Sequence, residues 1–93
     1  MISHVVLLKL VDASDATECV DRLHALVGRC AGLDALEAGV DVLRTEASYD
    51  VSIVARHPDL AGLQAYTEDP VHQEFLAWLR PRLAARAVVD STA

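Results

Sequence analysis

Few side chains in this sequence could exchange a proton near neutral pH or bind a metal. The chain has four histidines, two cysteines and two tyrosines. These form no Cys-x-x-Cys pair, no His-x-x-x-His pair and no cluster with the spacing of metal ligands, and binding motifs for an organic cofactor are missing as well. We therefore expect no metal and no cofactor. Acid–base chemistry remains, in which an imidazole takes up a proton and a phenol donates a hydrogen bond.

The two cysteines are predicted to be small buried residues without a disulfide. Cys19 and Cys30 both fall on the first predicted helix, where eleven residues at about 1.5 Å per residue would separate them by roughly 16 Å. A disulfide requires Cα atoms within about 7 Å. The two thiols therefore cannot pair within one chain, and free cysteines of this kind usually behave as hydrophobic core residues.

Hydrophobic periodicity predicts the elements that must position the acid–base groups. In the first strand, alternation places His4 on one face with Val6 and Leu8, and leaves Val5 and Leu7 on the other face. The element order predicts an α+β, ferredoxin-like β-α-β-β-α-β fold with both helical crossovers on one face of the sheet, in a single domain over residues 1–93. The strands are predicted at residues 2–10, 36–44, 49–56 and 87–90, and the helices at residues 16–31, 58–68 and 70–80.

Several residues predict where these elements begin, bend and end. Asp15, followed three residues later by a glutamate, is a possible capping box for the first helix, and Gly32 is placed to end it. Gly39 is a possible bulge in the second strand. Asp69 can cap a further helix with Pro70 in its first turn, so we expect the second crossover to be a broken pair of helices.

The composition predicts an association between two copies of the chain. Hydrophobic residues make up 53% of the sequence, although only 4% are aromatic. The helices of one chain cover one face of the sheet, which leaves Val5 and Leu7 on the other face without a partner. We therefore expect a homodimer that forms through the sheet face opposite the helices, with two-fold symmetry.

Charge and hydropathy exclude other classes of partner. The formal net charge of -6 argues against binding to nucleic acid, which needs clustered Lys and Arg. The apolar stretch from Val5 to Leu8 is far shorter than the roughly 20 residues of a membrane span and lacks the layout of a signal peptide. We therefore expect a cytoplasmic protein that binds neither a membrane nor nucleic acid.

Three segments of the sequence resemble the stress-responsive A/B barrel (Dabb) domain family. They are Ile2–Leu10, Leu63–His72 and the closing Val88–Asp90. The resemblance implies a homodimeric α+β barrel. It does not fix a function, because members range from plant stress proteins to a polyketide cyclase that acts in olivetolic acid formation.

The resemblance to that type of cyclase implies a catalytic site. Tyr66 and His72 match its tyrosine and the histidine six positions later, and His4 matches a histidine early in its first strand. Asp69 departs from the pattern, since many relatives have a histidine before the proline. The resemblance implies aldol-type chemistry on a hydrophobic, polyketide-like carbonyl compound, with His72 as the base and Tyr66 as the hydrogen-bond donor. In the first turn of its helix, His72 would be kept neutral by the helix dipole.

Other interpretations of the same residues stay open. Tyr66 and His4 could be core residues, and His72 could lie on the surface near Asp69. The other two histidines are expected to be solvent-facing or structural. The protein could also be a non-catalytic stress-responsive oligomer or ligand carrier. A third alternative is a cofactor-free monooxygenase of the same topology, which the scarcity of aromatic residues makes less attractive.

Overall fold

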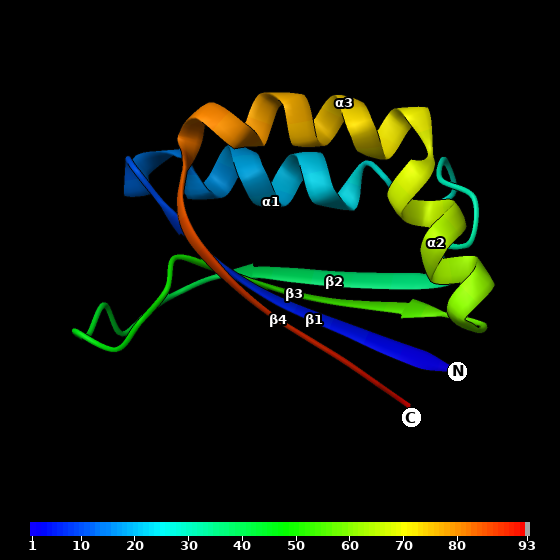
Figure 1. Ribbon diagram of the computed structural model, residues 1–93. Helices are drawn as coiled ribbons and strands as arrows, with labels where there is room; N and C mark the ends of the chain where they lie inside the picture. The colour runs from blue at the N-terminus through cyan, green and yellow to red at the C-terminus, as the bar shows by residue number, and fades with distance from the viewer. Residues whose placement is uncertain (93) are drawn as a thin grey trace.

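A four-stranded antiparallel sheet carries all the helices on one of its faces (Figure 1). The computed structural model describes residues 1–92. Its strands are β1 (Ile2–Leu10), β2 (Ala35–Val40), β3 (Val51–His57) and β4 (Leu83–Thr92), in the order β2-β3-β1-β4, and its helices are α1 (Ala16–His24), α2 (Leu60–Glu68) and α3 (Pro70–Leu79). Two short 3-10 helices, Ala13–Asp15 and Arg80–Arg82, complete the elements. This order confirms the predicted ferredoxin-like β-α-β-β-α-β fold.

The central strand β1 positions most of the core. It pairs with β3 on one side and with β4 on the other. Val6, Leu8 and Leu10 are buried beneath the helices, whereas Leu7 and Lys9 are exposed on the opposite face. This alternation confirms the predicted two-residue period and places His4 on the helix-covered face.

The first helix is shorter than its apolar periodicity predicted. Cys19 and Leu23 are buried as expected, but α1 ends at His24, and turns occupy the residues that follow. Gly28, at a φ of 79°, already has a left-handed backbone conformation that ends regular helix, four residues before Gly32 at 70°. The two cysteines are free and buried.

The predicted capping box and the predicted bulge are both wrong. Asp15 forms no capping hydrogen bond, because the chain enters α1 through a 3-10 turn whose cap is Asp12, which accepts from the Ser14 amide at 2.9 Å. Gly39 pairs with Ser52 in an unbroken register. The irregularity in the sheet lies instead between β1 and β4, at Lys9 and Leu10.

The loop between β2 and β3 is longer than predicted, since β2 ends at Val40 and β3 begins only at Val51, directly after Asp50. The buried carboxylate of Asp50 accepts from the Leu10 amide at 2.7 Å and pairs with Arg44 Nη2 at 2.7 Å. The hydrogen bond from the Leu10 amide and the neighbouring guanidinium keep the pKa of Asp50 below its ordinary value. The loop projects from the end of the sheet opposite the chain termini (Figure 1).

The second crossover is a broken helix pair, as predicted. Asp59 caps α2 by accepting from the Gly62 amide at 2.8 Å. Asp69 caps α3 by accepting from the Val71 amide at 2.9 Å, with Pro70 in the first turn. The second carboxylate oxygen of Asp69 accepts from the Ala31 amide at 3.0 Å, which ties the loop after α1 to the break between α2 and α3.

Trp78 joins the elements of the helical layer. The guanidinium groups of Arg22 from α1 and Arg82 lie over its ring, with their central carbons 4.6 and 4.5 Å from the ring centroid. The Phe75 ring stacks at 6.2 Å between centroids. Among the described residues, no helix is long and apolar enough to cross a membrane.

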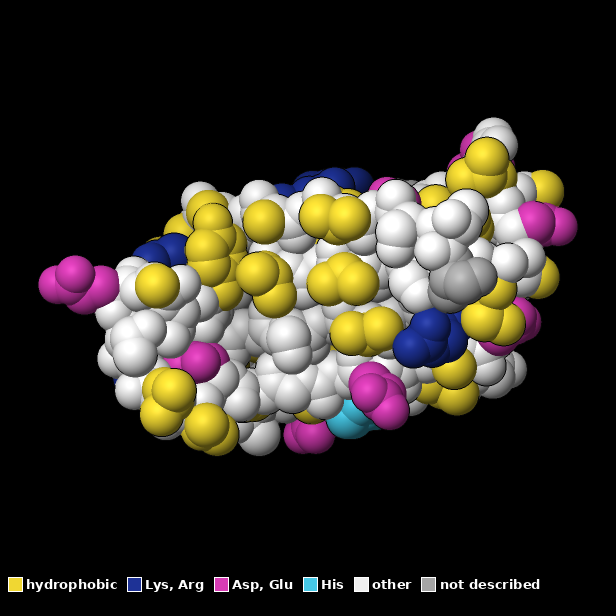
Figure 2. All heavy atoms as spheres, turned by 90° about the horizontal axis from the view of Figure 1, so that it is seen from below, with side chains coloured by type: hydrophobic (Ala, Val, Ile, Leu, Met, Phe, Trp, Pro, Cys, Tyr) yellow, Lys and Arg dark blue, Asp and Glu magenta, His cyan; other side chains and the backbone are white. Residues whose placement is uncertain are grey.

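The face of the sheet away from the helices carries an apolar centre. The register places Val5 of β1 between Val54 of β3 and Val89 of β4 on this face, and Leu7 between Ser52 and Ala87. Figure 2 shows hydrophobic side chains gathered here with charged groups toward the rim. Leu7 and Val89 are 38% and 64% exposed.

Candidate active site

A cavity of about 260 Å³ lies between the sheet and the helices and brings the three predicted site residues together. His4 comes from β1, Tyr66 from α2 and His72 from α3. The cavity is lined by apolar Val6, Leu8, Ile53, Phe75, Leu76 and Leu79 and by polar Thr67, Gln73 and Arg86. Two hollows of similar volume lie beside the β2–β3 loop and between α1 and α3, and neither is lined by a histidine among residues 1–92.

The Tyr66 ring lies close to the imidazole rings of both His72 and His4. Its ring centroid is 4.1 Å from that of His72 and 6.5 Å from that of His4. The side chain is buried, and burial is the main reason why its pKa lies well above its ordinary value. The phenol therefore keeps its proton at neutral pH and can serve as a hydrogen-bond donor.

His72 is a buried imidazole in the same cavity. It is buried in the first turn of α3, so the surface interpretation is wrong. Its Nδ1 lies 3.3 Å from the Thr67 carbonyl oxygen, which places a proton on Nδ1 and leaves the lone pair of Nε2 free. The pKa of His72 is lowered, as expected for a ring kept neutral, but the first cause is burial rather than the helix dipole.

A carboxylate that the sequence analysis missed holds His4. The β1–β4 register places Asp90 directly opposite His4 on the helix-covered face, and His4 Nδ1 contacts Asp90 Oδ1. The carboxylate fixes the orientation of the ring and leaves Nε2 as its second functional atom. The sequence indicates only that Asp90 lies on the last strand. It does not predict the contact with His4, because the two residues are 86 positions apart and meet only through the register of β1 and β4.

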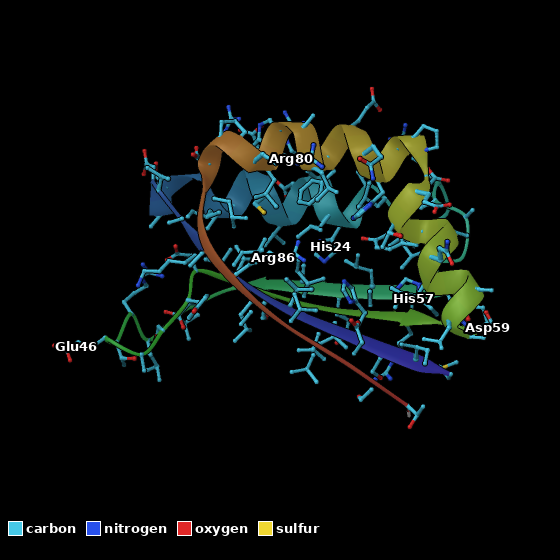
Figure 3. All side chains as sticks on the ribbon, in the orientation of Figure 1. His24, Glu46, His57, Asp59, Arg80 and Arg86 are labelled. Carbon is cyan, nitrogen blue, oxygen red and sulfur yellow. The ribbon has the colours of Figure 1, made fainter. Side chains whose placement is uncertain are left out.

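A fourth ring, His57, lies behind Tyr66. The sequence predicts that His57 and His24 are solvent-facing or structural. His24 is exposed, but His57 is completely buried, so the solvent-facing interpretation of His57 is wrong. Figure 3 shows it at the end of β3 beneath α2. Alternation could have identified it, since β3 runs one residue further than predicted and His57 shares the buried face of Ala55.

His57 has one hydrogen-bond partner and one unpaired nitrogen. Its Nδ1 lies 2.7 Å from the Gly32 carbonyl oxygen and donates to it. Among residues 1–92, Nε2 is buried without a partner. The His57 ring is 4.9 Å from that of Tyr66 and 5.9 Å from that of His4. His57 therefore connects the loop before β2 to the ring of Tyr66.

The described residues contain no group of three His, Cys, Asp or Glu side chains arranged to hold a metal ion. The sequence profile of the stress-responsive A/B barrel domain matches residues 2–93. The chain belongs to this family. The comparison with curated proteins gives no match.

Solved structures of this fold include proteins that are dimers. A dimeric ferredoxin-like protein of unknown function from Thermobifida fusca is 26% identical, with a TM-score of 0.86 over 99% of this chain and 90% of its own. A dimeric protein of unknown function with a ferredoxin-like fold from Bacteroides fragilis is 20% identical, with a TM-score of 0.87 over 99% and 95%. Hydroxynitrile lyase from Passiflora edulis is 12% identical, with a TM-score of 0.79 over 97% and 90%.

Proposed function

We propose that this family member is a cofactor-independent enzyme that catalyses aldol-type ring closure in a small hydrophobic carbonyl compound, as a polyketide cyclase does. The observation that carries the proposal is the contact between Tyr66 and His72, whose ring centroids are 4.1 Å apart in an otherwise largely apolar cavity. Apolar walls around a site strengthen hydrogen bonds to developing charge. The fold is compatible with such a role, since a lyase shares it.

The proposed reaction is a proton transfer followed by carbon–carbon bond formation. Nε2 of His72 removes a proton from the carbon next to a substrate carbonyl, and the Tyr66 hydroxyl donates a hydrogen bond to the enolate oxygen that forms. The enolate carbon attacks a second carbonyl of the same molecule. The resulting alkoxide takes the proton back from the His72 imidazolium, so the ring closes without a change in oxidation state.

His4 acts as a second polar contact at the same site. Asp90 holds its Nδ1, and the ring lies 6.5 Å from Tyr66 between centroids. With Nδ1 protonated towards the carboxylate, Nε2 can accept a hydrogen bond from a substrate hydroxyl or enol. We assign His4 to substrate orientation and Asp90 to the positioning of His4.

The functional unit is proposed to be a homodimer formed through the uncovered sheet face. The apolar residues on that face and the dimeric relatives of the same fold support this arrangement. Each cavity then lies on the helix-covered side of its own sheet, away from the interface. Association buries Val5, Leu7 and their neighbours without obstructing either site.

The test uses a linear diketone whose two carbonyl groups are separated by three carbons, so that ring closure gives a six-membered ketol. We expect wild-type protein to accelerate ring closure, followed by NMR, and His72→Ala and Tyr66→Phe to lower the rate by about 10²-fold or more. The matched controls, His24→Ala and Tyr49→Phe, change the same residue types outside the cavity. Full activity in both site variants would rule out these roles.

The alternative functions give distinct results in solution. Saturable binding of the diketone without turnover indicates a ligand carrier, and a large heat-resistant assembly indicates a protective oligomer. Oxygen uptake with a phenolic substrate indicates a monooxygenase. Each of these results would replace the cyclase-like assignment.

A further inference from the structure

Arg86 gives the wall of the cavity a charge that the proposed ring closure does not use. It lies on β4 opposite Leu8, on the sheet face that carries the helices (Figure 3). It lines the cavity next to apolar side chains such as Leu8 and Leu79. Arg86 is exposed and, among residues 1–92, forms no ion pair and no side-chain hydrogen bond. Arg29 and Arg80 also have no such partner, but neither of them lines this cavity.

The surroundings of Arg86 leave its guanidinium free to bind a ligand at the wall of the cavity. A chain with a formal charge of -6 has many carboxylates to pair with its arginines. The nearest candidate on the same strand face is Asp90, which contacts His4 instead. Arg86 is also the only Lys or Arg among the described residues that line this cavity. Its guanidinium can form paired hydrogen bonds to a planar anion such as a carboxylate.

We propose that the cavity selects hydrophobic carbonyl compounds that carry a carboxylate, and that Arg86 binds this carboxylate. The proposal rests on the proposed function and narrows its substrate class. Arg86 and Asp90 are four residues apart on one strand face, about 13 Å along β4. The carboxylate then lies at the Arg86 end, and the reacting carbonyl lies near Tyr66, His72 and the His4–Asp90 pair.

The size of the cavity fits a short acid. Its volume of about 260 Å³ is below the range of roughly 300–1,000 Å³ that is usual for drug-sized ligands. The apolar side chains between the two polar ends suit an aliphatic chain or a single ring. Arg86 is a specificity-determining residue in this scheme, because it contacts a part of the substrate that does not react.

The first test measures binding of octanoate, methyl octanoate and heptyl phosphate by NMR titration of labelled protein. We expect octanoate to bind at least about tenfold more tightly than its neutral ester, since only the carboxylate can form paired, charge-assisted hydrogen bonds with the guanidinium. Equal affinities for acid and ester would overturn the proposal. Tighter binding of the phosphate ester than of octanoate would overturn the choice of a carboxylate.

The second test removes the charge at position 86. Arg86→Met should lower the affinity for octanoate about tenfold and leave methyl octanoate within twofold, whereas Arg86→Lys should keep part of the preference. Arg80→Met is the matched control, because Arg80 is exposed and does not line the cavity. An equal loss of affinity for acid and ester in Arg86→Met would show a structural role and refute the proposal.

The two proposals fail in different ways. Ring closure of the neutral diketone without any preference for octanoate removes the Arg86 assignment and leaves the cyclase-like activity. An acid preference that depends on Arg86, in a protein without turnover, removes the enzymatic role and supports Arg86 as the anion-binding residue of a carrier.

Discussion

His57→Phe and His57→Ala should have very different effects on stability. The alanine variant removes a completely buried ring and leaves a cavity, and we expect it to lower the free energy of unfolding by about 3–5 kcal/mol. The phenylalanine variant refills most of that space. It loses the hydrogen bond to the Gly32 carbonyl, which we expect to cost about 1–3 kcal/mol if the carbonyl finds no water.

A second effect offsets this loss. Phenylalanine also removes Nε2, a buried nitrogen without a partner among residues 1–92, whose desolvation costs about 1–3 kcal/mol. The two terms have opposite signs and similar size. His57→Phe should therefore lie within about 1 kcal/mol of wild type, since the half-buried Gly32 can be reached by water.

Urea unfolding followed by circular dichroism measures the difference. All variants are compared at one protein concentration, because the proposed dimer would make unfolding depend on concentration. The exposed His24→Ala is the control and should change the free energy of unfolding by less than about 0.5 kcal/mol. If His57→Phe is as destabilising as His57→Ala, Nε2 has a partner and the reasoning is wrong.

Three further predictions concern other parts of the molecule. Gly28→Ala should lower the free energy of unfolding by about 1–2 kcal/mol, because Gly28 has a left-handed backbone conformation. Gly32→Ala should lower it clearly more in urea unfolding, since the new Cβ would lie 2.0 Å from the Gly62 carbonyl oxygen. Equal losses in the two variants would contradict this close approach. Because the pKa of His72 is lowered by folding, the unfolded chain binds a proton below about pH 6.5 that the folded chain does not bind. The free energy of unfolding should therefore fall on acidification. The fall should be steeper in wild type than in His72→Gln. Burial raises the pKa of Cys19 to about 11, so a thiol reagent should modify it only as fast as the protein opens, and rapid labelling of native protein would contradict its burial.

The sequence predicts the order of the elements better than their ends. The alternation in β1 and the cap at Asp69 are local signals, and both are confirmed by the structure. The early end of α1 at His24 and the early end of β2 at Val40 are not visible in the apolar pattern. A left-handed glycine causes the first, and the second follows from the buried contact of Asp50 with Leu10, far away in the sequence.

In the candidate site, too, the sequence predicts some residues and not others. Tyr66, His72 and His4 could be named from residue type, spacing and family resemblance, and the structure brings them to one cavity. Alternation along β3 could have placed His57 on the buried face, but the contacts of Asp90 and His57 could not be predicted. They depend on strand register and on how the loop at Gly32 packs beneath α2. A residue that positions a neighbouring side chain can be predicted only when the position of that side chain is known.

The position of Trp78 gives the protein a built-in optical probe. It is the only tryptophan in the chain, and its emission depends on the arginines of α1 and of the segment after α3 that lie over its ring. Phe75 stacks on Trp78 and also lines the cavity. The wavelength of the fluorescence therefore reports whether α1 and α3 stay docked, and a ligand that displaces Phe75 should change the signal without an added label.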